Sequence, residues 1–252
     1  MPTSATATNS HKATRQAIAL LKRKSSRTYR AGMVRYAIPT DRAFGVPVGS
    51  IRSVAKQVGR DHQLALALWK TGWFEARMLA TMVDEPALVT PSQMDRWSAD
   101  FDNWAICDTA CFGLFDRSPH AFRKVTEWAP RKEEFVRRAA FALMASVALH
   151  DKKSPERPFV RWLSLIERGA KDDRNFVKKG VSWALRTVGA RNLALHRRAI
   201  ALSKRLAKSE VQSERWVGND ALRDLQRPLV ATRVARKEAK ANTRARARAR
   251  AL

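Results

Sequence analysis

Thirteen segments of similar length carry apolar residues at the three- to four-residue spacing of an α-helix, and this pattern constrains the fold most strongly. Short breaker segments separate them, and we find neither alternating strand patterns nor Asn-Gly hairpin turns. Helices joined by short links pack as antiparallel neighbours, so the sequence predicts an all-α fold. Stacked pairs would make an α-solenoid with a concave face, and a compact all-α fold is the alternative. We expect helices at residues 12–24, 27–37, 47–58, 61–71, 73–83, 91–100, 102–116, 119–129, 131–149, 157–168, 174–188, 191–206 and 213–226.

Helix-start signals support several of these boundaries. Residues 90–93 read Thr-Pro-Ser-Gln, which predicts a capping box with proline in the first turn. Asp61 and Asp173 each stand before an apolar-periodic run and are predicted to begin a helix. We expect a single helical domain over 12–230, between a disordered N-terminus at 1–11 and a disordered basic tail at 231–252.

The chain is strongly basic, with 49 Lys and Arg against 23 Asp and Glu and a formal net charge of +26. Residues 1–30 and 233–252 each carry a net +7, so residues 31–232 keep +12. A basic body favours a polyanionic partner, and nucleic acid is the first candidate. The alternative is that the basic tails only aid solubility or bind RNA without specificity.

Cysteine content and hydropathy exclude several protein classes. Cys107 and Cys111 are the two cysteines, too few for a disulfide framework or a closed zinc site. No apolar run approaches the roughly 18 residues needed to cross a bilayer. We therefore expect a reduced, cytoplasmic, nucleoid-associated protein of bacterial type that does not enter a membrane.

The segment 174–188 presents a tryptophan away from its core stripe. Trp183 lies roughly 215° around the helix from the centre of that stripe, close to Lys179 and Arg186. It either packs against an adjacent helix or is presented to a ligand. The core stripe itself consists of Val177, Val181, Ala184, Leu185 and Val188.

The segment 101–116 places a carboxylate in the middle of an aromatic face. Asp108 follows Trp104 by one helical turn, so the two side chains are neighbours. A buried carboxylate is costly unless it is paired or functional, and an ion pair with an arginine is the structural alternative. The aromatic face is Phe101, Trp104, Phe112 and Phe115, and the opposite apolar stripe is Ile106, Ala110 and Leu114.

The segment 131–149 carries two consecutive arginines that cannot point the same way. Arg138 heads the stripe of Ala142, Ala145 and Leu149, so we expect one arginine to face inward and the other to face solvent or phosphate. Arg138 is a candidate partner for Asp108. Trp104, Asp108, Arg138 and Trp183 thus form a set. Such a set could stack on a deoxyribose or a cationic base while its carboxylate stabilises developing positive charge.

Three segments carry a resemblance to a known family. The segments are 101–108 (Phe-Asp-Asn-Trp-Ala-Ile-Cys-Asp), 134–141 (Glu-Phe-Val-Arg-Arg-Ala-Ala-Phe) and 175–186 (Asn-Phe-Val-Lys-Lys-Gly-Val-Ser-Trp-Ala-Leu-Arg). Together they resemble the DNA alkylation repair glycosylases built from HEAT-like repeats, the alkylpurine glycosylase D type. Upstream, Arg35-Tyr36 and the glycine-containing segment 44–52 resemble the same family. The similarity spans about residues 30–226.

The resemblance implies a solenoid of degenerate HEAT-like helix pairs with a concave basic groove for duplex DNA containing alkylated bases. It implies hydrolysis of the N-glycosidic bond of cationic N3- and N7-alkylated purines, without extrusion of the base into a pocket. Trp104, Asp108 and Trp183 would line the lesion deoxyribose. The expected DNA-binding residues are Arg138, Tyr36, Arg137, Lys178, Lys179 and Arg186.

The residue types suit this chemistry, because an alkylated purine is already cationic and leaves without a general acid. Asp108 would stabilise an oxocarbenium-like transition state and orient water. We expect no cofactor, no metal and a monomer. Two other functions compete: a non-catalytic helical-repeat module that binds DNA or RNA through phosphates, and a protein-binding solenoid.

Overall fold

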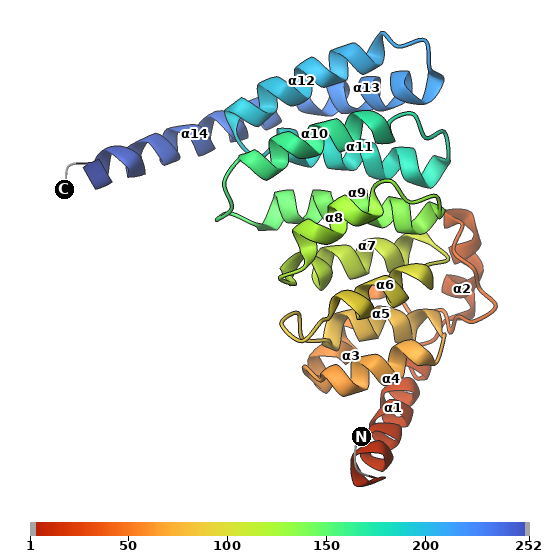
Figure 1. Cartoon of the computed structure of the whole chain (residues 1–252). Coiled ribbons are helices and arrows are strands. Elements are labelled where there is room, and N and C mark those ends of the chain that lie inside the picture. Colours follow the sequence, from red (N-terminus) through yellow and green to blue (C-terminus); the bar gives the residue numbers. More distant parts are fainter. Residues whose placement is uncertain (1–3, 250–252) are drawn as a thin grey trace. The chain divides into compact units, whose positions relative to one another are not determined.

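The computed structural model describes residues 4–249, which form fourteen α-helices and two short 3-10 helices without a β-strand (Figure 1). The predicted all-α fold is confirmed, and twelve of the thirteen expected helices occur within a few residues of their predicted bounds, while the first begins at Ser4, eight residues before the expected start. None of the described helices is long and apolar enough to cross a membrane. The chain forms two compact units, Met1–Ala121 and Phe122–Leu252. The single domain over 12–230 stays a prediction.

The first unit is built from short helices that stack in two layers. Helices α3, α5 and α7 are successive neighbours, while α4 packs against α5 and α1 packs against α3 and α4. The elements are α1 (Ser4–Lys22), α2 (Arg27–Met33), η1 (Val34–Tyr36), α3 (Val48–Val58), α4 (His62–Lys70), α5 (Phe74–Val83), α6 (Pro91–Ala99), α7 (Trp104–Gly113), η2 (Phe115–Arg117) and, at the boundary of the units, α8 (Ala121–Trp128).

The second unit repeats the two-layer arrangement with longer helices. Helices α9, α11 and α13 pack in succession as one layer, and α10 and α12 pack side by side against them. Close packing of α12 and α13 depends on Gly218, where a Cβ atom would overlap the backbone of Ala207. The elements are α9 (Glu134–His150), α10 (Arg157–Gly169), α11 (Asn175–Gly189), α12 (Leu193–Ala207), α13 (Gln212–Leu225) and α14 (Pro228–Ala249).

Helix caps follow the sequence signals in part. Asp61 caps α4, and the Thr90 hydroxyl accepts the Gln93 backbone N–H at 3.1 Å. The reciprocal half of the predicted capping box is absent, because the Gln93 side-chain amide donates to the buried Asp84 carboxylate at 2.6 Å. The prediction that Asp173 begins α11 is wrong, since Arg174 occupies the cap position and its backbone N–H bonds to the Asp172 carboxylate.

The described parts of both terminal segments are helical where disorder was expected. Helix α1 begins at Ser4, and α14 continues from Pro228 to Ala249. The first half of α14 packs on α12 and α13, where Val234 is buried and the Lys237 ammonium donates to the Ala190 carbonyl at 2.6 Å. Alanine and arginine are among the best helix formers, so this stretch is helical without an apolar stripe along its whole length. Residues 1–3 and 250–252 of the two segments lie outside the described residues.

A buried carboxylate from α5 fixes the turn that leads into α3. The Glu75 side chain is fully buried and accepts the backbone N–H groups of Phe44, Gly45 and Val46 at 2.8, 2.7 and 3.0 Å. Gly45 has a φ of +80°, and a side chain there would overlap the Ser26 carbonyl. One charged side chain thus satisfies three buried backbone donors of an irregular segment.

Replacing Glu75 with glutamine is expected to destabilise the protein. The amide carries less acceptor charge and brings N–H groups toward three backbone donors, so we expect a loss of about 2–4 kcal/mol. Urea unfolding followed by circular dichroism measures the change. Glu85→Gln, in the half-buried loop that follows α5, is the matched control and should shift stability by less than about 0.5 kcal/mol. Equal stabilities of the two variants would contradict the role given to Glu75.

Candidate functional site

Helix α7 presents the first group of candidate residues. Its N-terminus is capped by Asn103, whose side-chain oxygen accepts the backbone N–H groups of Ala105 and Ile106 at 3.0 and 3.1 Å. The stripe of Ile106, Ala110 and Leu114 is buried, as predicted. Burial of that stripe fixes the rotation of the helix, and the opposite side carries Trp104 and Asp108.

Trp104 is anchored to the segment that carries Tyr36. The Trp104 ring nitrogen donates to the Tyr36 backbone carbonyl at 2.7 Å, which joins residues 68 positions apart. Trp104 is half-buried, whereas the Tyr36 side chain is 66% exposed. The next residue, Ala37, adopts a left-handed conformation with a φ of 53° and ends the 3-10 helix there. Two of the predicted site residues therefore lie together, with the Tyr36 ring presented to solvent.

Asp108 lies one turn after Trp104 and is also half-buried. Asp108 affects the nearby Cys111 thiol. The pKa of this thiol lies well above its ordinary value, because the thiol is buried, contacts Cys107 and lies near the negative charges of Asp108 and Asp116. The predicted aromatic face around Asp108 is divided, since Phe101 and Phe115 are buried while Phe112 is 41% exposed. The carboxylate thus lies at the border between the core and the exposed surface of α7.

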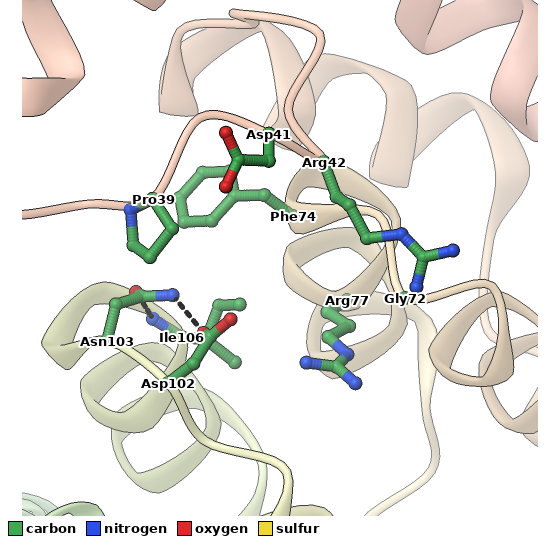
Figure 2. Close-up of a pocket in the computed structure, with 9 residues that line it drawn as sticks. All are labelled: Pro39, Asp41, Arg42, Gly72, Phe74, Arg77, Asp102, Asn103 and Ile106. Atoms are coloured by element: carbon green, nitrogen blue, oxygen red, sulfur yellow. Dashed lines mark hydrogen bonds between the residues drawn. The ribbon is translucent and has the colours of Figure 1, made fainter.

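A cavity of about 310 Å³ opens beside the N-terminus of α7 (Figure 2). Its walls carry two carboxylates, Asp41 and Asp102, and two guanidinium groups, Arg42 and Arg77. Arg77 is held by the Asp100 backbone carbonyl at 3.0 Å, and its Nε is buried without a hydrogen-bond partner among the described residues. Walls that carry both positive and negative charges do not suit a run of phosphates. This cavity was not predicted from the sequence.

The two arginines of α9 point in different directions, and the prediction that one of them faces inward is confirmed. Arg138 is buried, and its guanidinium donates to the Phe176 backbone carbonyl of α11 at 2.6 Å. Arg137 faces the other way and forms an ion pair with Asp172 at 3.3 Å. Arg138 is therefore the inward-facing arginine, and part of its hydrogen-bonding capacity serves the packing of α9 on α11.

Asp172 is the centre of a small charged cluster at the start of α11. Burial raises its pKa, but hydrogen bonds from the Arg174 side chain and backbone outweigh this effect, and the pKa lies below its ordinary value. The Arg174 guanidinium contacts Asp172 at 2.6 Å and also donates to the Lys132 carbonyl at 2.7 Å. The cluster therefore ties α11 to the segment before α9, and Arg137 belongs to it.

Helix α11 confirms the predicted division between its core stripe and Trp183. The residues of the stripe are completely buried, while Trp183 is half-buried and Lys179 is exposed. Arg186 is partly exposed and lies 3.9 Å from Asp220, an acid that also accepts the Ser182 hydroxyl at 2.6 Å.

Lys178 has a partner that the sequence analysis missed. Its ammonium lies 5.4 Å from the centre of the Trp216 ring on α13, a distance typical of a cation–π contact. Trp216 is half-buried and shares this side of the unit with Lys178. A tryptophan that follows three polar residues, Ser213, Glu214 and Arg215, was the available sequence signal.

The candidate residues thus form two groups, one in each unit. Tyr36, Trp104 and Asp108 belong to the first, and Arg137, Arg138, Lys178, Lys179, Trp183 and Arg186 belong to the second. Within residues 4–249, no three His, Cys, Asp or Glu side chains lie where they could hold a metal ion. The first group contains two aromatic side chains, Tyr36 and Trp104, and one carboxylate, Asp108.

Comparisons with known proteins identify the family. A search of curated proteins finds no match. One solved structure is similar to this chain, with a TM-score of 0.74 and 18% sequence identity, and the match covers 87% of this chain and 95% of the chain in that structure. That structure is described as "A new family of proteins related to the HEAT-like repeat DNA glycosylases with affinity for branched DNA structures". This likeness confirms the HEAT-like repeat fold. A family model described as DNA alkylation repair enzyme matches residues 17–225. The chain therefore belongs to the DNA alkylation repair enzyme family.

Proposed function

We propose that the protein is a DNA glycosylase that hydrolyses the N-glycosidic bond of cationic N3- and N7-alkylated purines in duplex DNA. The observation that carries this proposal is the single turn of α7 that presents a half-buried tryptophan and a half-buried carboxylate together. Family membership and the net charge of +26 support DNA as the substrate.

The chemistry needs few protein groups. The bond between the sugar C1′ and the base nitrogen breaks, its electron pair neutralises the cationic base, and positive charge develops on the deoxyribose. The Asp108 carboxylate stabilises that charge and accepts a hydrogen bond from the attacking water. Water adds to C1′ and its proton passes to solvent, which leaves an abasic site and a free neutral base.

Trp104 has a positioning role beside this carboxylate. Its ring nitrogen is bonded to the Tyr36 carbonyl, so the orientation of the ring is set before DNA binds. A fixed ring face excludes water from one side of the sugar. Trp183 and Arg138 contact the DNA from the second unit, with Lys179 and Arg186 beside Trp183 on the same helix.

A second candidate function is non-catalytic binding of branched DNA. The description of the solved relative, which names affinity for branched DNA, favours it. Arg138 donates a hydrogen bond to the Phe176 carbonyl, and an arginine that only stabilises the packing of α9 on α11 would make the same bond. Base release separates the two functions, because a binding module leaves alkylated bases in place.

Asp108→Asn is expected to abolish most base release while retaining the fold. The amide cannot supply negative charge to the developing cation, so we expect a loss of about 100-fold or more in single-turnover release of 7-methylguanine. Affinity for the same duplex should change by less than about threefold. Asp173→Asn, which neutralises an exposed acid in the second unit, is the matched control. Release at the wild-type rate by Asp108→Asn would refute the assignment.

Trp183→Ala and Val181→Ala are expected to separate function from stability. Val181 is completely buried, so its truncation should cost about 1–3 kcal/mol of unfolding free energy and leave single-turnover excision nearly unchanged. Trp183 lies off the core stripe, so its truncation should lower excision more than stability. Thermal unfolding and base release on both variants measure the difference, and a Trp183→Ala protein that unfolds would contradict it.

A further inference from the structure

Helix α10 carries a stripe of arginines that the proposed reaction does not use. Arg157, Arg161 and Arg168 fall within about 40° of one another on the helical wheel. They lie roughly 150° around the helix from the buried residues that pack α10 into the unit. Those buried residues are Phe159, Trp162 and Ile166. The arginines therefore face away from the core.

None of these three arginines has an ion-pair partner among the described residues, and all three are exposed. The one acid of α10, Glu167, lies off the stripe and is paired with Arg205 at 2.7 Å. Along the helix axis the stripe spans about 16 Å. Three unneutralised cations in a row are an electrostatic site for a polyanion.

The arginine stripe borders a groove of about 580 Å³ between α8 and α10. No acidic side chain of the described part of the chain lines it. Its apolar part includes Phe122, Trp162, Pro155 and Leu165. The Phe122 and Trp162 rings stack at 5.1 Å between centroids, and Phe122 remains half-buried. The groove thus combines an apolar lining with a cationic edge.

The loop that forms one end of the groove is held in place. The Arg191 guanidinium donates to the backbone carbonyls of Ala148, Asp151 and Ser154, and it lies 3.9 Å from the Phe159 ring centre. The Asp151 carboxylate accepts the backbone N–H groups of Lys153 and Ser154 at 2.7 and 2.9 Å. A preformed groove binds a flexible ligand at lower entropic cost.

We propose that this groove is a second nucleic-acid site, which binds single-stranded DNA through its phosphates and its bases. The arginines neutralise successive phosphates, and the apolar lining contacts unpaired bases. Paired bases in a duplex are stacked inside the helix, so a duplex would use the arginines and leave the apolar lining empty. The site lies on α8 and α10, on helices other than those carrying the candidate residues of the second unit.

The test compares the full-length triple variant Arg157→Gln, Arg161→Gln, Arg168→Gln with a triple variant of equal charge loss. The control is Arg197→Gln, Arg198→Gln, Lys204→Gln, three exposed α12 cations that also lack ion-pair partners among the described residues. Fluorescence anisotropy measures binding of labelled oligo(dT), of an abasic oligomer of equal length and of a blunt duplex.

The α10 variant is expected to bind oligo(dT) about tenfold or more weakly than wild type, with a salt slope lower by about 2. Its affinity for the duplex should fall no further than that of the control variant. Wild-type protein should bind oligo(dT) several-fold more tightly than the abasic oligomer, because bases contribute.

Equal loss in both triple variants, or equal loss on duplex and single strand, would overturn the proposal. Equal binding of oligo(dT) and the abasic oligomer would remove the role of the bases. Displacement of oligo(dT) by polyglutamate at equal charge would identify a site for acidic peptides instead. The measurement does not depend on base release, so it stands or falls separately from the proposed glycosylase activity.

Discussion

Hydrogen bonds to buried polar side chains hold the layered helical core together in both units. Glu75 enters the first unit and binds three backbone N–H groups. Asp84 binds the Gln93 amide, and Arg138 in the second unit binds the Phe176 carbonyl. Unpaired burial of such groups would cost several kcal/mol each. These bonds fix the turns and helix contacts from which the candidate residues project.

Hydrogen bonding also explains how the candidate side chains of the first unit are held. Trp104 keeps its ring nitrogen bonded to the Tyr36 carbonyl while remaining half-buried. Asp108 lies where the buried side of α7 meets its exposed side. Under the proposed function, a carboxylate at such a border is shielded from part of the solvent and so acts more strongly on nearby positive charge.

Helical periodicity and the wheel positions were predictable from the sequence, because burial repeats every three to four residues. The core stripe of α11 and the outward position of Trp183 follow from that repeat alone. Contacts between distant segments were not predictable: Trp104 with Tyr36, Lys178 with Trp216, and Glu75 with the Phe44–Val46 backbone. Helix α14 was missed because its Arg-Ala run lacks an apolar stripe, although both residues favour a helix. The concave basic groove stays a prediction.

The most direct test of the proposed activity is single-turnover incubation of the wild-type protein with a duplex containing one 7-methylguanine, followed by quantification of free base and of alkali-sensitive abasic sites. The account predicts that both products form together, in equal amounts and up to the amount of lesion present. Tight binding of branched or methylated DNA without release of either product would contradict it and would identify a DNA-binding protein of the same fold.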